Sequence, residues 1–384
     1  MVSPSVDLKT DAKAAVWHFP NLLVLVLFFV SGFAALVYEV LWLKELGLLF
    51  GNTAYAAATT LAVFFLGLSV GGYVWGKNVA KYRSPLRVYA FMEFGIAVSA
   101  LLYFLILDIY HLIYAPLFTA FGDYPWFFTI VKFLLACGVL FIPSFLMGGT
   151  LPVMGQHLIR HSSQLARTGS LLYAINTSGA ALGAFVAAFY LPLALGFRNS
   201  YLLAISLSAG IGIVAYLLSR LSVAAEQASP SPASPPASGA GSKSAVDSAA
   251  QRSTKNGTVN PWHRIGFIAF FSGFTTLSLE VLWTRMFAQV LQNSVYTFAT
   301  ILIVFLVALA LGAVLANGLS RCKTNPSALL CLMLALGGIL VGCTPLVFNH
   351  LTNGLEYLSP KAGWADYVSS VFGNTAAVLL APGI

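Results

Sequence analysis

Long hydrophobic runs separated by short polar stretches make up most of this chain. Within each run the apolar positions are continuous and do not alternate with polar ones. A run of about 20 apolar residues lets a helix cross a bilayer, whereas strands of a membrane barrel alternate. The pattern therefore predicts an all-α polytopic membrane protein with ten apolar segments, which span about residues 20–48, 54–76, 87–107, 127–157, 170–193, 199–219, 264–291, 295–316, 327–348 and 366–384.

The hydrophobic pattern also contains an internal repeat. SGFAALVYEVLW begins at Ser31 and SGFTTLSLEVLW begins at Ser272, which gives an offset of 241 residues (272 − 31 = 241). The same offset aligns later positions without a gap: Asn52 with Asn293, Tyr55 with Tyr296, Phe64 with Phe305, and Gly71 with Gly312. Self-similarity at a fixed period indicates one structural unit present in two copies.

A stretch rich in Ala, Ser and Pro separates the two copies. Such a composition buries too little apolar surface to fold, so residues 222–260 are expected to form a disordered cytoplasmic linker. Residues 1–19 form the expected cytoplasmic N-terminus, and residues 20–221 the first membrane repeat of six helices. Residues 261–384 form the first four helices of the second repeat.

The arrangement predicts two parallel six-helix repeats of the major facilitator type, because both copies begin on the same side of the membrane. FLLACGVLFIPSF around Pro143 aligns with NTAAVLLAPGI around Pro382. The second repeat is therefore expected to be truncated within its fourth helix, and the chain to be a fragment of a longer protein.

Charged residues are scarce, and their positions predict the topology. The chain is 59% hydrophobic and 8% charged, with a net charge of +8, whereas a soluble domain is about 25% charged. Basic residues follow the second, fourth, sixth and eighth runs, while the segment from Asp108 to Asp123, interpreted as an opposite loop, contains none. The positive-inside rule then places the N-terminus and the linker in the cytoplasm. The basic residues form no continuous face or tail, so no nucleic-acid partner is predicted.

Residues 1–384 contain none of the usual motifs of soluble enzymes. There is no dinucleotide-binding GxGxxG after a strand, no Walker motif, no HExxH and no GxSxG. The cysteines lack CxxC or metal-type spacing and are expected to be small apolar helix residues: Cys137, Cys322, Cys331 and Cys343. No catalytic, cofactor-binding or metal-ligating residue is therefore predicted within this chain.

Two acidic residues within apolar runs are the strongest candidates for function. Glu39 and Glu280 occupy the same position of the repeat, and a carboxylate inside a membrane helix is energetically unfavourable. One interpretation places both in a central cavity, where they act together to bind a cation or relay protons. The other places each near the outer membrane interface beside a local partner, with Trp42 and Lys44 as interfacial anchors.

Small and polar residues predict close contacts between helices. Gly67 and Gly71 are four residues apart, and the second copy keeps this pair as Ala308 and Gly312. Such spacing lets two helices approach closely. Asn176 begins the fifth helix, where its side chain is a candidate for an interhelical hydrogen bond or a binding role.

Several of these segments together resemble a known family. They are SGFAALVYEVLW, GNTAYA, FFLGLSVGGYVWGK, PSFLMGGTLP and LLYAINTSGAALGAF in the first copy, and SGFTTLSLEVLWTRMF and NSVYTFATILIVFLVALALG in the second. They resemble the membrane region of the bacterial fused major-facilitator/spermidine-synthase-like (polyamine aminopropyltransferase-like) proteins. The resemblance covers nearly all of the chain outside the linker and the first twenty residues.

The resemblance implies a bacterial inner membrane and a link to polyamine biosynthesis or transport. A cytoplasmic domain similar to spermidine synthase would follow this region and use decarboxylated S-adenosylmethionine as its co-substrate. Its glycine-rich loop and catalytic aspartates have no counterpart here, so no catalytic residue is carried over. A polyamine is a multivalent cation, which suits an acidic intramembrane pair. A major-facilitator-type transporter of a small cation and a membrane anchor or sensor without transport remain the alternatives.

Overall fold

A computed structural model describes residues 19–50, 54–159, 165–228, 261–291, 295–319, 325–356 and 363–384. Most of the expected N-terminus and linker lies outside these ranges. The described residues form ten α-helices and one short 3-10 helix, and they contain no strand. The α-helices are α2 (Phe19–Phe50), α3 (Ala54–Asn78), α4 (Pro85–Phe121), α5 (Pro125–Leu158), α6 (Leu165–Phe189), α7 (Leu191–Ala228), α9 (Pro261–Phe287), α10 (Val295–Leu319), α11 (Pro326–Leu351) and α12 (Trp364–Gly383).

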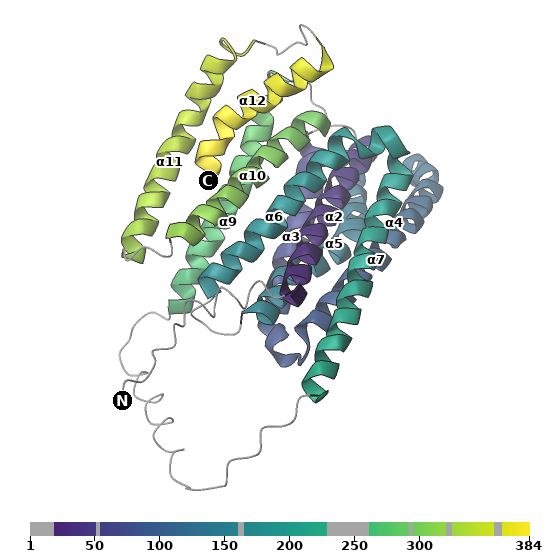
Figure 1. Ribbon diagram of the computed structural model, residues 1–384. Helices are drawn as coiled ribbons and strands as arrows, with labels where there is room; N and C mark the ends of the chain where they lie inside the picture. Colours follow the sequence, from purple (N-terminus) through teal and green to yellow (C-terminus); the bar gives the residue numbers. More distant parts are fainter. Residues whose placement is uncertain are drawn as a thin grey trace, which may run out of the picture.

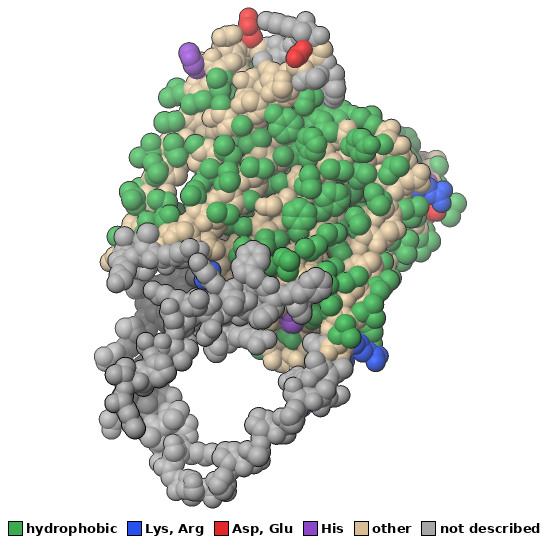
Figure 2. All heavy atoms as spheres, in the orientation of Figure 1, with side chains coloured by type: hydrophobic (Ala, Val, Ile, Leu, Met, Phe, Trp, Pro, Cys, Tyr) green, Lys and Arg blue, Asp and Glu red, His purple; other side chains and the backbone are tan. Residues whose placement is uncertain are grey.

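The prediction of an all-α polytopic membrane protein is confirmed. Nine of the described helices, all except α12, are long and apolar enough to cross a membrane. Hydrophobic side chains cover most of the visible lateral face, while the visible charged side chains lie near its edges (Figure 2). A surface of this kind suits lipid tails and not water.

Three of the predicted boundaries are wrong in an informative way. Helix α4 continues to Phe121 through residues interpreted as a loop, because ring contacts such as Phe121–Phe127 (4.4 Å between centroids) join its end to α5. Helix α7 continues to Ala228, seven residues into the predicted linker, because Ala, Glu and Gln favour helix. The fifth apolar segment is predicted to end near residue 193, but helix α6 ends at Phe189. Gly196 (φ 73°) bends the chain near the start of α7.

The helices form two groups that meet along α6 and α10 (Figure 1). In the first group α2 packs mainly on α6 and α7, α3 packs on α5, and α4 packs on α5 and α7. In the second group α10 packs on α9 and α12, and α11 packs on α12. Helix α6 therefore lies between α2 of the first copy and α10 of the second.

One helix crossing is built the same way in both groups. A Cβ atom added to Gly71 of α3 would overlap the backbone carbonyl of Phe145 on α5. A Cβ atom added to Gly312 of α10 would lie 2.6 Å from the carbonyl oxygen of Ile384 at the end of α12. Both helix pairs thus cross with their backbones in contact, which only glycine allows. The small-residue spacing in the sequence is therefore structural.

An aromatic pair is also repeated between the two groups. The rings of Trp42 and Phe64 lie 6.4 Å apart in the first group, and those of Trp283 and Phe305 lie 6.2 Å apart in the second. Each tryptophan is 241 residues from its counterpart, as is each phenylalanine (283 − 42 = 305 − 64 = 241). The internal repeat of the sequence is therefore also a repeat of packing.

The second group is the less enclosed of the two. Helices α9 and α11 expose apolar side chains over most of their length. Gly273 of α9 has no neighbour within 4 Å where a Cβ atom would stand, whereas a Cβ atom on its counterpart Gly32 would overlap Asn176 of α6. The equivalent faces of α2 and α9 therefore have different surroundings.

Candidate functional site

The structure places both candidate glutamates inside the protein. Glu39 lies in the second half of α2 and is 3% exposed, and Glu280 lies in α9 and is 2% exposed. Each glutamate lies in an apolar run that forms a helix, and each projects from a buried face of that helix; on α9 this face also carries Trp283 and Phe287. Glu280 is buried even though most of α9 is exposed.

The two carboxyl groups share one electrostatic environment. The charge of Glu280 acts on Glu39, although 241 residues separate them (280 − 39 = 241). The Oε1 atom of each glutamate is buried and has no hydrogen-bond partner within the described residues. A buried polar atom without a partner is energetically unfavourable, and a bound water or ion at the site is one explanation.

No buried cation in the described residues neutralises these carboxyl groups. The buried polar side chains include Glu39, Glu93 and Glu280 but no lysine, arginine or histidine. Two neighbouring carboxylates in an apolar interior cannot both stay ionised without a counter-charge. Each carboxyl group can therefore hold a proton, or the pair can bind a cation that comes from outside the protein.

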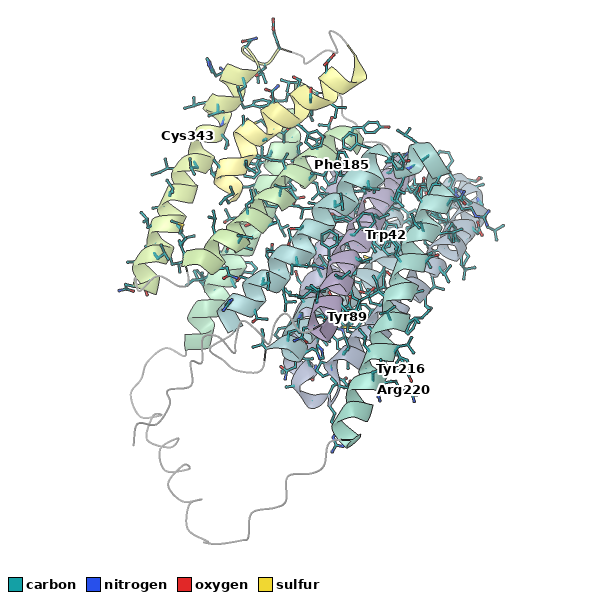
Figure 3. The ribbon with its side chains drawn as sticks, viewed as in Figure 1. Trp42, Tyr89, Phe185, Tyr216, Arg220 and Cys343 are labelled. Atoms are coloured by element: carbon teal, nitrogen blue, oxygen red, sulfur yellow. The ribbon has the colours of Figure 1, made fainter. Side chains whose placement is uncertain are left out.

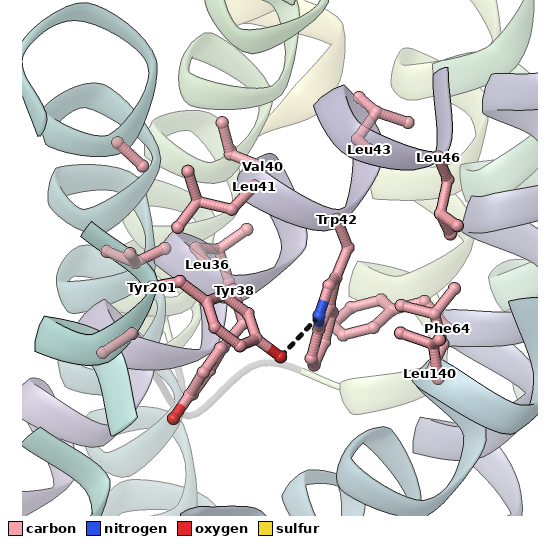
Figure 4. Packing of buried hydrophobic residues seen from close by; sticks show 14 of the residues in the cluster. Leu36, Tyr38, Val40, Leu41, Trp42, Leu43, Leu46, Phe64, Leu140 and Tyr201 are labelled. Atoms are coloured by element: carbon pink, nitrogen blue, oxygen red, sulfur yellow. Dashed lines mark hydrogen bonds between the residues drawn. The ribbon is translucent and has the colours of Figure 1, made fainter. Parts of the chain in front are cut away.

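The interpretation of Trp42 as an interfacial anchor is wrong. Trp42 is fully buried, and its indole N–H donates a hydrogen bond of 3.0 Å to the hydroxyl of Tyr201 on α7 (Figure 4). Its ring also stacks on Tyr38, with 5.2 Å between centroids. Tryptophan is buried here because its one polar atom finds a partner within the bundle. Lys44 is half-buried and acts on the adjacent Glu45.

Sequence reasoning missed a third buried carboxyl group. Glu93 of α4 is 1% exposed, and it accepts a hydrogen bond of 2.5 Å from the Ser31 hydroxyl of α2. Its counterpart in the second copy is Leu334 (93 + 241 = 334), so the repeat did not draw attention to it. The available signal was an acidic residue inside the third apolar run, which the search for matching pairs passed over.

Asn176 forms the interhelical hydrogen bond that its position suggested. Its side-chain amide on α6 donates to the backbone carbonyl of Phe28 on α2 at 3.0 Å. The backbone carbonyl of Asn176 also lies against Gly32 of α2. The residue thus fastens α6 to α2, while its role in binding stays a prediction.

Replacement of Asn176 by alanine is expected to lower the stability by about 1 kcal/mol, because interhelical hydrogen bonds in membranes contribute roughly 0.6–1.7 kcal/mol. The apparent melting temperature of the purified protein is the measurement. Asn199→Ala is the matched control, since the amide of Asn199 donates to Leu195 within its own helix. Equal effects of the two changes would contradict an interhelical role for Asn176.

A small crevice lies where α6, α10 and α12 meet. Its lining consists of Phe189, Tyr296, Thr297, Thr300, Tyr367, Val368 and Val371. Ring contacts such as Phe189–Tyr296 (5.6 Å) close its walls. None of the lining residues is charged, so the crevice offers no anchor for an ion.

The described residues contain no group of three or more His, Cys, Asp or Glu that would hold a metal ion. Cys137, Cys331 and Cys343 are free thiols there, and Cys322 lies outside the described residues. Comparisons of the chain with protein-family models, with curated proteins and with solved structures gave no match.

Proposed function

We propose that this chain is the membrane region of a spermidine-synthase-like fused protein and that Glu39 and Glu280 together bind a cation inside it. The observation that carries the proposal is that the charge of Glu280 acts on Glu39 while each keeps a buried oxygen without a hydrogen-bond partner. A cation between the two carboxylates would remove both their repulsion and their missing partners. A purely structural anchor would have no need of such a site.

The repeat supports a transport-like use of this site. Glu39 and Glu280 belong to the first helix of each copy, and in major facilitator transporters the substrate site lies between the two halves. Two halves that move relative to each other would change the separation of the carboxyl groups. Such a change alters the affinity for a cation, which is the requirement for its uptake on one side and release on the other.

A polyamine is the favoured cation in this proposal. The motifs that resemble the spermidine-synthase-like family point to that chemistry, and an amine that carries several charges matches two acidic groups. Any aminopropyl transfer from decarboxylated S-adenosylmethionine would belong to a catalytic domain outside these residues. We place the protein in a bacterial inner membrane with the N-terminus and linker in the cytoplasm, on the strength of the loop charges and the family resemblance.

The double variant Glu39→Gln/Glu280→Gln tests the proposal. Purified protein in lipid nanodiscs is titrated with radiolabelled spermidine, and the double variant is expected to bind at least about tenfold more weakly, a loss of roughly 1.4 kcal/mol. Glu45→Gln is the control, because Glu45 lies on the same helix and is half-buried. Unchanged binding in the double variant, or no binding by the wild type, would contradict a polyamine site. Binding of a monovalent cation in place of spermidine would favour the small-cation transporter.

A further inference from the structure

The inference concerns Glu93, which the acidic pair does not explain. Ser31 of α2 donates to its Oε1 atom at 2.5 Å. The Tyr89 hydroxyl of α4, which donates to the backbone carbonyl of Leu27 at 3.4 Å, and the Ser208 hydroxyl of α7 lie near the same carboxyl group. All four side chains are buried. Three helices therefore surround one acid with hydroxyl groups that accept as well as donate hydrogen bonds.

No lysine, arginine or histidine among the described residues acts on this carboxyl group. Tyr38 of α2 is the other titratable neighbour on which it acts, and the Tyr38 hydroxyl is buried without a hydrogen bond of good geometry, although Ser208 lies near it. Helix α5 also packs on α4, and its buried residues include no titratable side chain. An ionised carboxylate here would be stabilised by hydroxyl groups but would have no counter-charge in an apolar interior, which is energetically unfavourable.

The site of Glu93 is separate from the acidic pair. Ser31 and Tyr38 are seven residues apart and so share one face of α2, whereas Glu39 points about 100° away from Tyr38. Ser31, which donates to Glu93, lies eight residues before Glu39 on α2 (39 − 31 = 8), a rise of about 12 Å along the helix. In Figure 3 Tyr89 accordingly lies lower in the bundle than Trp42. The two acidic sites thus differ both in the face of α2 that they use and in depth.

We propose that Glu93 and the hydroxyl groups of Ser31, Tyr89 and Ser208 form a proton-binding site within the first group of helices. Glu93 holds the proton on one carboxyl oxygen, and Ser31 donates to Oε1. In the described part of the second group Leu334 stands where Glu93 stands in the first, so the equivalent position carries no acid. This proton site is independent of the cation pair and has no equivalent at the matching position of the second copy.

Infrared spectroscopy of the purified full chain in nanodiscs tests this proposal at neutral pH. The background is Glu39→Gln/Glu280→Gln, so the outcome does not depend on the cation site. We expect a carbonyl band of a protonated carboxylic acid that shifts in D₂O and disappears when Glu93→Gln is added. Absence of the band in this background, or its persistence with Glu93→Gln, would overturn the proposal.

Ser31→Ala keeps the test decisive if Glu93→Gln fails to fold. Loss of the donated hydrogen bond is expected to move the carbonyl band to higher frequency without removing it. Ser272→Ala is the matched control, because Ser272 is the exposed counterpart of Ser31 in the second copy and should leave the band unmoved. A band whose frequency is the same in Ser31→Ala and Ser272→Ala as in the background would belong to another acid, and this result would also reject the proposal.

Discussion

Replacement of Gly71 by alanine is expected to destabilise the protein by about 1–3 kcal/mol, the usual cost of overpacking. The new Cβ atom would overlap the backbone carbonyl of Phe145, and a backbone atom cannot move aside as the end of a side chain can. Helices α3 and α5 would have to separate along their crossing. The apparent melting temperature in detergent micelles is the measurement, and Gly71→Leu should prevent assembly of the bundle.

The matched control for this prediction is Gly210→Ala. Gly210 lies within α7 and has no neighbour within 4 Å of the added Cβ atom. Alanine there loses less backbone entropy than glycine, so the stability should be unchanged or higher by up to about 1 kcal/mol. A fall in melting temperature as large as that of Gly71→Ala would mean that the close crossing of α3 and α5 is not what requires glycine.

Charge reversal at Glu39 is expected to depend strongly on Glu280. In Glu39→Lys the new ammonium group can pair with the retained Glu280 carboxylate, whose charge acts on Glu39 in the wild type. In Glu39→Lys/Glu280→Gln the lysine has no partner, and an unpaired buried charge destabilises by about 3–5 kcal/mol. The single variant should therefore be produced as folded, monodisperse protein, and the double variant should aggregate or melt at a much lower temperature.

Glu45→Lys provides the control for the reversal experiment. Glu45 lies on the same helix, where it accepts a hydrogen bond from Tyr103 and its charge interacts with that of Lys44. The effect of adding Glu280→Gln should therefore be the same with or without Glu45→Lys, as expected for independent sites. If Glu280→Gln lowers the melting temperature of the Glu39→Lys variant no more than that of the Glu45→Lys variant, the two glutamates do not share a site.

Much of this architecture follows from the sequence alone. The apolar runs predicted the described helices because a segment in lipid must satisfy its backbone hydrogen bonds internally, which the α-helix does locally. The offset of 241 residues predicted that Trp42 and Trp283 would occupy equivalent places, and each packs on an equivalent phenylalanine. The helices and the repeat depend only on the order of residues along the chain, so the sequence is enough to predict them.

Helix ends and the surroundings of single side chains were decided by tertiary contacts. Aromatic contacts with α5 accompany the extension of α4 well past its predicted end. Trp42 is a core residue and not an interfacial anchor, because its indole N–H donates to the Tyr201 hydroxyl. These outcomes need partners that lie far away in the chain. The hydrophobic pattern near Trp42 is the same whether or not such a partner exists.

The sequence by itself determined that Glu39 and Glu280 are equivalent, since equivalence is a property of the repeat. Only the tertiary structure decided that Glu280 influences Glu39 electrostatically, that each retains a buried oxygen without a partner, and that Glu93 accepts a hydrogen bond from Ser31 of another helix. The physical reason is that helix periodicity fixes which face a side chain occupies, while the packing of α2 against its neighbours fixes what that face meets.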